Sequence, residues 1–465
     1  MKTKYYLASF ILISLIGTFP IFSIAQTISA GGNHSLAICT DKTVKAWGGM
    51  GGGELGNGSD NNSFLPVQVS LLTSVFAVSA GFQHSLALKS DGTVWAWGKN
   101  DYGQLGNGNN TNSNIPLQVS SLTGVVAIAA GNFHSVALKN DGTVWTWGWN
   151  INGQLGNGNN SNSNVPIQVN LLTGITAIES GHDNVLALKN DGSVWVWGDN
   201  DYGQLGIGNN VNTNIPLQVN TLTGITAITS GGGHSMALKN DGTVWSCGEN
   251  STGQVGNGTN TNTNLFAQII SLNGIIAISA GWSFSLVLKN DNTIWTFGQN
   301  TSGQLGNGNN IDSNIPLQVT SLTGIVSISA GGSHSLVLKN DGSLWTWGWN
   351  GYGQMANGNG LGSNVPLVIT GLCQISNNIS EISKQLSISV FPNPFHSSTT
   401  IQLSGFVKNA EISIFNIYGQ NIETIKDISG EEIKLSRDHL LNGVYFIRII
   451  ENDKLIATDK LIITD

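Results

Sequence analysis

Histidines spaced fifty residues apart are the side chains of this 465-residue sequence best suited to acid–base chemistry. Asn184 and Phe284 interrupt the series, and a residue type repeated in most copies of a repeat usually belongs to its framework. His84 also shares strand parity with Leu86 and Leu88, so it should point the same way as those apolar side chains. We therefore expect buried, hydrogen-bonded histidines, with a ligand or general base as the alternative. The series comprises His34, His84, His134, His234 and His334.

Aspartates form a second regular series, in tight turns such as Asp91-Gly92, where Asp is favoured for local backbone bonding. Outside that series we find no paired carboxylates, no Gly-x-Ser-x-Gly and no His-Glu-x-x-His. Asn-rich loops such as residues 107–114 could offer carbonyls to calcium, but they lack the alternating Asp ligands of calcium loops, which favours solvated turns. We predict no catalytic residue, no metal, no cofactor and no enzymatic activity. The aspartates are Asp91, Asp141, Asp191, Asp241, Asp291 and Asp341.

The same fifty-residue spacing runs through most of the chain, without an insertion or deletion. It links Gly31, Gly81, Gly131, Gly181, Gly231, Gly281 and Gly331. It also links Trp47, Trp97, Trp147, Trp197 and Trp347, with Cys247 and Phe297 completing that column. Seven copies in strict register indicate a repeat architecture.

Each copy contains four short strand patterns. In the second copy these are residues 75–80, 84–89, 93–97 and a short fourth strand that begins at Pro116. Four antiparallel strands at this period predict a β-propeller, and seven copies predict seven blades. The first copy lacks a preceding Pro-initiated strand and the last ends with an unpartnered one, residues 366–369. We expect these two pieces to complete one blade and close the ring; an open solenoid is the alternative.

Positions that vary among the copies are the better candidates for a binding site. They follow the repeated Gly and the repeated Trp-Gly, and both stretches leave alternate strands at the same end if the strands pair in sequence order. We therefore expect them on one face of the disc, where aromatic side chains would anchor a partner. The alternative is that these rings pack against their own loops. The predicted anchors are Phe82, Tyr102, Phe133, Trp149, Tyr202, Trp282, Trp349 and Tyr352.

The three cysteines match no zinc motif. Cys39 ends the second strand of the first copy, and Cys373 follows the strand expected to complete that same blade. The two lie two strand spacings apart, about 9–10 Å, unless the chain curls over. A Cys39–Cys373 disulfide is possible and would hold the ring shut in an oxidising compartment. Cys247 replaces a framework Trp and is expected to be a buried thiol.

The pattern Gly-x-x-His-Ser-x-Ala-Leu-Lys-x-Asp-Gly-Thr-Val-Trp-x-Trp-Gly-x-Asn-x-x-Gly-Gln-Leu-Gly, as in residues 81–106, closely resembles the regulator of chromosome condensation repeat. The resemblance covers about 345 residues and implies a seven-bladed propeller. Kelch repeats have a similar period but need a Gly-Gly doublet with spaced Tyr and Trp, a combination that this pattern lacks. The founding eukaryotic member is a nucleotide-exchange factor that binds chromatin, whereas similar bacterial propellers include a secreted β-lactamase inhibitor.

After Leu372 the composition changes. Residues 373–385 look like a linker, and from Leu386 short alternating runs predict a small β-sandwich over residues 386–465. Its motifs resemble the C-terminal sorting domain of type IX (Por) secretion, which implies transfer through the outer membrane. An appended adhesive sandwich is the alternative. The matching segments are residues 390–395, 417–420, 443–446 and 460–463.

The N-terminus has the composition of a secretory signal peptide. Lys2 and Lys4 precede an apolar run over residues 5–22, and residues 23–25 (Ser-Ile-Ala) predict cleavage before Gln26. A transmembrane anchor is the alternative. Residues 26–372 contain nine Lys, no Arg and sixteen acidic residues, a charge balance that argues against a nucleic-acid partner.

These features predict an all-β chain: a signal peptide (1–25), a seven-bladed β-propeller (26–372), a linker and a sorting domain. We expect a secreted or cell-surface binding or adhesion protein, exported through the periplasm by the type IX machinery, with no membrane span in the mature chain. Its partner would be an extracellular protein or polysaccharide. The alternatives are a carbohydrate-active enzyme on a propeller, favoured by carboxylates in the pore or on the variable face, and a self-associating surface-coat protein.

Overall fold

The computed structural model describes residues 26–49, 51–170, 172–375, 388–416, 421–438, 440–451 and 454–465. The predicted signal peptide, residues 376–385 of the predicted linker and the motif at 417–420 lie outside these residues. The chain divides into two compact units, residues 1–377 and 378–465, which are treated separately below. The described residues contain strands and no helix long and apolar enough to span a membrane.

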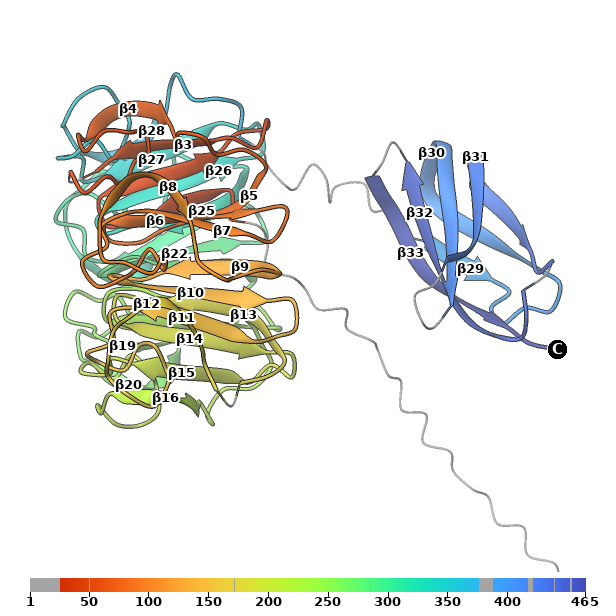
Figure 1. The fold of residues 1–465 in the computed structure, drawn as a ribbon, viewed down its shortest axis with the longest axis horizontal. Coiled ribbons are helices and arrows are strands. Elements are labelled where there is room, and N and C mark those ends of the chain that lie inside the picture. The colour runs from red at the N-terminus through yellow and green to blue at the C-terminus, as the bar shows by residue number, and fades with distance from the viewer. Residues whose placement is uncertain are drawn as a thin grey trace, which may run out of the picture. The chain divides into compact units, whose positions relative to one another are not determined.

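The first unit consists of seven four-stranded antiparallel sheets, and in each sheet the strands pair in sequence order (Figure 1). The first strands are β1 (Ile28–Ala30), β5 (Val75–Ala80), β9 (Val125–Ala130), β13 (Ile175–Ser180), β17 (Ile225–Ser230), β21 (Ile275–Ala280) and β25 (Ile325–Ala330). The second strands are β2 (His34–Ile38), β6 (His84–Lys89), β10 (His134–Lys139), β14 (Asn184–Lys189), β18 (His234–Lys239), β22 (Phe284–Lys289) and β26 (His334–Lys339). The third strands are β3 (Val44–Gly48), β7 (Val94–Gly98), β11 (Val144–Gly148), β15 (Val194–Gly198), β19 (Val244–Gly248), β23 (Ile294–Gly298) and β27 (Leu344–Gly348). The fourth strands are β4 (Ser63–Gln68), β8 (Ser113–Gln118), β12 (Ser163–Gln168), β16 (Thr213–Gln218), β20 (Thr263–Gln268), β24 (Ser313–Gln318) and β28 (Ser363–Val368). The prediction of a seven-bladed propeller is confirmed.

Each blade is buried on both faces by its neighbours, which explains the near-continuous apolar runs. In blade 2 all of β6 except Lys89 is buried. The turn that follows is fixed by Asp91, whose Oδ1 accepts hydrogen bonds from Thr93 N at 3.0 Å and Thr93 Oγ1 at 2.6 Å. Gly92 adopts a φ of +78°, which a side chain would strain. The expectation that these aspartates serve local backbone bonding is confirmed.

The fourth strand begins earlier than predicted. β8 starts at Ser113, so Pro116 is its fourth residue rather than its first. The pairing of β7 with β8 shifts register between Ala96 and Gly98. Because β8 pairs only with β7, one of its edges is free, and an edge strand at a register shift tolerates a residue that has no N–H.

The predicted exchange of a strand between the ends of the ring is wrong. β4 pairs with β3, and β28 pairs with β27, so every blade is built from one continuous segment. The ring is nevertheless closed, because the first and last blades contact each other as the other neighbours do. Ala30 N donates to Ser329 Oγ at 3.0 Å, as Ala80 N donates to Ser29 Oγ at 3.0 Å one interface further on.

The chain following β28 adds a covalent closure. A disulfide joins Cys39 to Cys373 with a Cα–Cα distance of 5.7 Å, and an isolated antiparallel bridge pairs Cys39 with Ile375. The chain therefore crosses from blade 7 to the second strand of blade 1. This crossing removes the two-strand separation that the sequence had suggested. Cys247 is a buried free thiol, as expected.

Large aromatic side chains fill the interfaces between blades. Trp97 is fully buried, packs against Leu36 and Val44 of the preceding blade, and donates its Nε1 hydrogen to Glu54 O at 2.8 Å. Trp47 makes the same bond to Gln354 O at 2.7 Å across the seam between the last and first blades. Five of the seven interfaces thus combine apolar burial with a satisfied indole N–H, while Cys247 and Phe297 take the place of the tryptophan in the other two.

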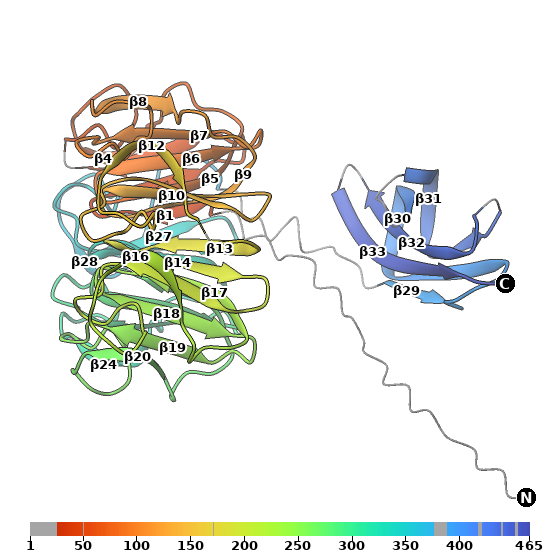
Figure 2. The same cartoon turned by 60° about the horizontal axis from the view of Figure 1, so that its bottom comes forward.

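The second unit is a small β-domain made of β29 (Ile388–Phe391), β30 (Ser398–Asn416), β31 (Asn421–Ser436), β32 (Gly443–Glu451) and β33 (Lys454–Ile463) (Figure 2). Its strand order is β29-β30-β32-β33, with β31 on β30. The first part of β30 pairs with β29 and its last part with β32, while register shifts interrupt its long pairing with β31. The two long strands β30 and β31 therefore run through both layers of the predicted sandwich and join them. The core between the layers includes Ile401, Ile412 and Ile447.

Two of the sorting-domain motifs contact each other. Asn393 Nδ2 donates to Lys460 O at 2.6 Å, and Ile462 N donates to Asn393 Oδ1 at 2.8 Å. Phe395 N also donates to Ile462 O at 3.0 Å. The 390–395 segment is thereby attached to the terminal strand.

Candidate functional site

The two variable stretches of each blade lie at the same end of the ring. In blade 2, Lys99 N after β7 donates to Gln83 O after β5 at 2.8 Å, and Trp149 N donates to Phe133 O at 2.8 Å in blade 3. We call this end, formed by the loops between first and second and between third and fourth strands, the variable face. The opposite end, with the Asp turns and the links between blades, is the turn face. The expectation that both stretches share one end is confirmed.

A channel runs along the axis between the first strands. Residues 30–32 and their equivalents from all seven blades line a cavity of about 80 Å³ at the variable face. A second cavity of about 80 Å³ is lined by some of the same residues, including Ala30 and Ser180, by the residues that precede them, and by Gln26 and Ile128. The first strand of each blade is therefore the innermost, which the sequence alone did not settle.

Hydroxyl groups line the second cavity, with one carboxyl group among them. In five blades a Ser or Thr side chain accepts a hydrogen bond from a backbone N–H of the next blade. Ala129 and Glu179 occupy this position in blades 3 and 4. Burial within the channel raises the pKa of Glu179 to about 8, so the carboxyl group is largely protonated at neutral pH.

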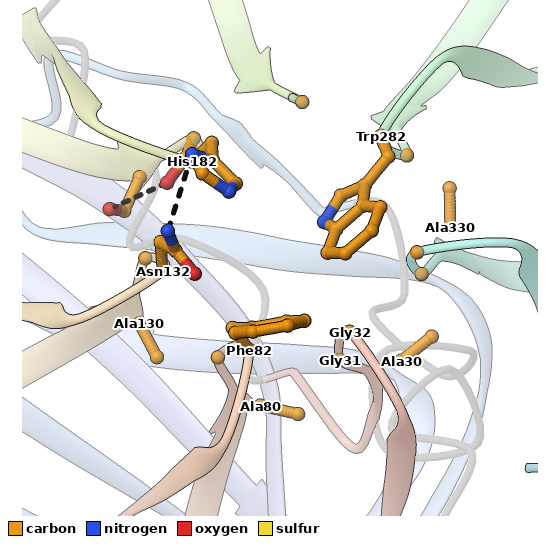
Figure 3. A pocket seen from close by; sticks show the side chains of 18 of the residues that line it. Ala30, Gly31, Gly32, Ala80, Phe82, Ala130, Asn132, His182, Trp282 and Ala330 are labelled. Carbon is orange, nitrogen blue, oxygen red and sulfur yellow. Dashed lines mark hydrogen bonds between the residues drawn. The ribbon is translucent and has the colours of Figure 1, made fainter. Parts of the chain in front are cut away.

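Aromatic rings lie around the mouth of the channel at the variable face (Figure 3). Phe82 of blade 2 and Trp282 of blade 6 meet across the mouth with their ring centroids 5.3 Å apart. His182 lies edge-on to Trp282 at 6.0 Å, and Phe133 lies edge-on to Phe82 at 5.7 Å. Gly32 leaves room for the Phe82 ring, because a Cβ at position 32 would collide with it.

The ring cluster extends outward on blades 2 and 3. Tyr102 lies 5.3 Å from Phe133 and stacks on Trp149, also at 5.3 Å. Trp349 and Tyr352 form a separate edge-to-face pair at 5.1 Å. Tyr202 is 45% exposed and has no aromatic partner among the described residues. Five of the eight predicted anchors thus form one cluster, two form a pair and one stands apart.

Polar groups that the sequence did not single out lie beside the cluster. His182 Nδ1 is 2.8 Å from Asp183 Oδ2, and Gln154 Nε2 donates to Asp183 Oδ1 at 3.4 Å. Asn132 Nδ2 lies 3.3 Å from His182 Nδ1, while its Oδ1 is buried without a hydrogen-bond partner in the described structure. These residues could have been noticed in the sequence, because they differ between the copies of the repeat. Their proximity at the channel mouth, however, depends on closure of the propeller.

A further carboxylate lies on the variable face at Asp199. Its Oδ2 accepts a hydrogen bond from Gln204 Nε2 at 2.8 Å. Burial raises the pKa of Asp199, and the like charges of Asp201 and Asp183 add to that effect. Three carboxylates of blade 4 therefore interact on this face.

The two faces carry different charges. The loops of the variable face hold eight acidic residues and one lysine, whereas the turn face holds seven aspartates and eight lysines. Most of those lysines pair with an Asp of the same turn or lie over a Trp ring, as Lys89 does with Asp91 and Trp95. The negative charge of the propeller is thus concentrated on the variable face. Its acidic residues are Glu54, Asp60, Asp101, Asp183, Asp199, Asp201, Glu249 and Asp312.

The repeated histidines belong to the framework. His84 is fully buried, and its Nε2 lies 2.9 Å from Ser135 Oγ of the next blade. Burial lowers the pKa of His34, His84 and His334 to about 3, and that of His134 and His234 to about 4. No group of His, Cys, Asp or Glu in the described residues is arranged to hold a metal ion. The expectation of buried, hydrogen-bonded histidines is confirmed.

Comparison with protein families matches both units. The profile described as "RCC1-like domain" matches residues 159–389. Two profiles described as "Regulator of chromosome condensation (RCC1) repeat" match residues 43–88 and 91–138, and residues 25–54, 77–104 and 125–154. The "Secretion system C-terminal sorting domain" profile matches residues 389–464. No curated protein shows a significant match.

Solved structures with the same fold include human WBSCR16, which is 24% identical with a TM-score of 0.60 over 68% of this chain and 87% of the other. Prp20p from Saccharomyces cerevisiae is 23% identical with a TM-score of 0.63 over 79% of this chain and 89% of the other. Yeast RCC1 (Prp20) bound by Kap60 gives 21% identity and a TM-score of 0.65 over 83% and 93%. At these identities the likeness concerns the fold.

Proposed function

Because the chain belongs to the family of RCC1-repeat propellers and ends in a secretion-system sorting domain, we propose that it is an extracellular binding protein whose variable face captures a partner. The sorting domain indicates type IX secretion to the cell surface or extracellular space. On this proposal the mature chain begins at Gln26, residues 26–372 form the binding ring, and residues 386–465 direct export. A surface protein or polysaccharide would be the ligand.

The aromatic cluster on the variable face is the observation that carries the proposal. Rings of two neighbouring blades, 2 and 3, meet there, and Trp282 joins them from across the channel. Trp282 and Trp349 are each 37% exposed, which is unusual for side chains of this size. Clustered aromatic side chains dominate the energetics of protein interfaces and also provide flat surfaces for sugar rings.

The test compares capture of purified surface polysaccharides and outer-membrane proteins by the mature chain and its variants. Trp149→Ala combined with Trp349→Ala should weaken capture at least tenfold while the circular dichroism spectrum stays unchanged. The matched control is Trp95→Ala, which removes a half-buried tryptophan from the third strand of blade 2, next to the turn face. Equal capture by all three proteins would contradict the proposal.

A carbohydrate-active enzyme remains the second candidate, because carboxylates occur in the channel and on the variable face. Asp199, with its raised pKa, could act as a general acid, and Asp183 could serve as its partner. However, both are bonded to glutamines of the framework, and neither lines the axial cavities. Release of reducing ends from a polysaccharide panel, lost in Asp199→Asn, would favour the enzyme.

A further inference from the structure

We propose that the mouth of the axial channel, on the variable face, receives the guanidinium group of one arginine side chain from a partner protein. The inference rests on the proposed binding function and assigns a ligand chemistry to part of the same face. The channel mouth comprises Phe82, Asn132, His182 and Trp282, with Glu179 deeper inside.

The size of the site favours a side-chain group over a whole small molecule. Each of the two cavities, which share lining residues such as Ala30 and Ser180, measures about 80 Å³. Sites for drug-sized ligands typically measure about 300–1,000 Å³. The channel can therefore take the end of one side chain, while the rest of the partner would lie on the surrounding face.

The charge of the site favours a cation. Among the described residues lining the two cavities, Glu179 is the one carboxyl group and none is Lys or Arg. The Glu179 carboxyl group forms no hydrogen bond or ion pair with other described residues. The surrounding loops add eight acidic residues against one lysine, and the low-dielectric walls of a channel focus such a field.

The shape of the mouth favours a planar cation. The rings of Phe82 and Trp282 lie there with their centroids 5.3 Å apart, and a guanidinium group stacks on aromatic rings better than an ammonium group does. The Asn132 side chain, only 5% exposed, supplies a polar group. The one hydrogen of His182 Nδ1 points to Asp183 Oδ2 at 2.8 Å. The contact of 3.3 Å between His182 Nδ1 and Asn132 Nδ2 therefore contributes little to the hydrogen bonding of the Asn132 amide. That amide is free to bind a ligand.

Ion pairing should also move a proton. Since burial keeps Glu179 protonated near neutral pH, an arriving guanidinium group would lower the pKa of this carboxyl group again and release its proton to solvent. The other titratable groups at the cavities are His182, which is paired with Asp183, and the α-amino group of Gln26, a residue that lines the second cavity and, on the proposed cleavage, begins the mature chain. Proton release therefore gives a readout distinct from affinity.

The experiment measures binding of the mature chain to a Gly/Ser peptide that carries four arginines. A second peptide replaces each arginine with citrulline, which has a similar shape without the charge, and a third carries lysine. We expect binding of the arginine peptide at least tenfold tighter than the citrulline peptide, with the lysine peptide between them. Calorimetry in buffers of different ionisation enthalpy should detect proton release near pH 7.

Three variants locate the site. Asn132→Leu and Glu179→Ser should each weaken binding of the arginine peptide at least fivefold, and Glu179→Ser should abolish proton release. Serine is the residue that four of the other six blades carry at the position equivalent to Glu179. Asp241→Asn, on the turn face, removes a charge elsewhere and should change neither. Equal affinity for the arginine and citrulline peptides, or equal effects of Glu179→Ser and Asp241→Asn, would overturn the inference. If the arginine peptide fails these tests but a natural partner is still captured through the aromatic cluster, the proposed binding function holds and only the arginine site is rejected. If no partner is captured at all, both proposals are rejected.

Discussion

Acid should unfold the propeller through its five framework histidines. Each is neutral in the folded ring because burial lowers its pKa from the ordinary 6.5 to about 3 or 4. A group whose folded pKa lies below its unfolded pKa favours the unfolded state as pH falls between the two values, since the unfolded chain binds the proton first. Stability contributed by these residues is thus complete above about pH 6.5 and is lost progressively toward pH 3–4.

The magnitude follows from the linkage relation. At pH 5 protonation stabilises an unfolded histidine of pKa 6.5 by about 2 kcal/mol, whereas the folded residue remains neutral. Five such residues amount to about 10 kcal/mol, which is comparable with the whole stability of a typical domain, about 5–15 kcal/mol. The propeller should therefore lose most of its resistance to denaturant between pH 7.5 and 5.

The chain itself supplies the test variant. Asn184 occupies the histidine position in blade 4 and donates from Nδ2 to Ser230 Oγ of the next blade at 2.9 Å. His134 in blade 3 bonds the equivalent Ser180 Oγ through Nε2 at 2.8 Å, so asparagine has the same partner there. In His134→Asn the loss of unfolding free energy between pH 7.5 and 5, measured by guanidinium denaturation, should shrink by about 2 kcal/mol. His396→Asn, in an exposed position of the C-terminal domain, is the control that removes no buried imidazole. An identical pH dependence in wild type and His134→Asn would refute the assignment of acid sensitivity to these residues.

Three further predictions concern the framework and the channel. Trp97→Ala should lower the unfolding free energy by about 3–5 kcal/mol, whereas Trp97→Phe, which copies Phe297 of blade 6, should cost much less in the same denaturation assay. Removing the disulfide by Cys39→Ser opens a loop closed over a separation of 334 residues and should destabilise the oxidised ring by about 2–5 kcal/mol; free thiols at both cysteines after alkylation without reductant would contradict this pairing. Glu179→Ser should stabilise the ring at pH 8, by about 2–4 kcal/mol after allowance for solvent in the channel, because the raised pKa of Glu179 means that the unfolded chain ionises first as pH rises above 4.5. An unchanged denaturation midpoint at pH 8 would show that Glu179 ionises freely in the folded protein.

The repeat made most of the propeller predictable. Strands such as 75–80 and 84–89 coincide with β5 and β6, because the residue types that form strands and turns recur in every copy. The error in ring closure arose from the fourth strand, since its pattern is compatible with pairing either backward to β3 or forward to the next first strand. The two arrangements are distinguished by the pairing of Lys45 with Gln68 and its equivalents in the other blades. That pairing is a contact between segments about twenty residues apart, which the local residue pattern does not specify.

The site was predictable only in part, for a physical reason. Alternate strands place Phe82 and Tyr102 at one end, so the choice of face follows from local geometry. The meeting of Phe82 with Trp282 does not, because two hundred residues separate them and the axis alone brings blades 2 and 6 together. Glu179 could have been noticed as the residue that breaks a column of small side chains, but its position inside the channel required knowing which strand is innermost.

The departures from the repeat point to function because the framework does not need them. In the other six blades Ser, Thr or Ala occupies the position of Glu179, so the innermost strands pack without a carboxyl group there. Gly32, Gly232 and Gly332 likewise show that the position of Phe82 and Trp282 needs no aromatic side chain. Placing a carboxyl group in the channel and a Trp ring at its mouth costs burial of a polar group and exposes apolar surface. In a chain whose seven copies are otherwise so similar, such costs would be removed by substitution from a neighbouring copy unless binding required them. These departures also share one end, where the negative charge gathers, while the turn face keeps its Lys–Asp pairs. A partner that is basic and approaches along the axis is what this arrangement would select.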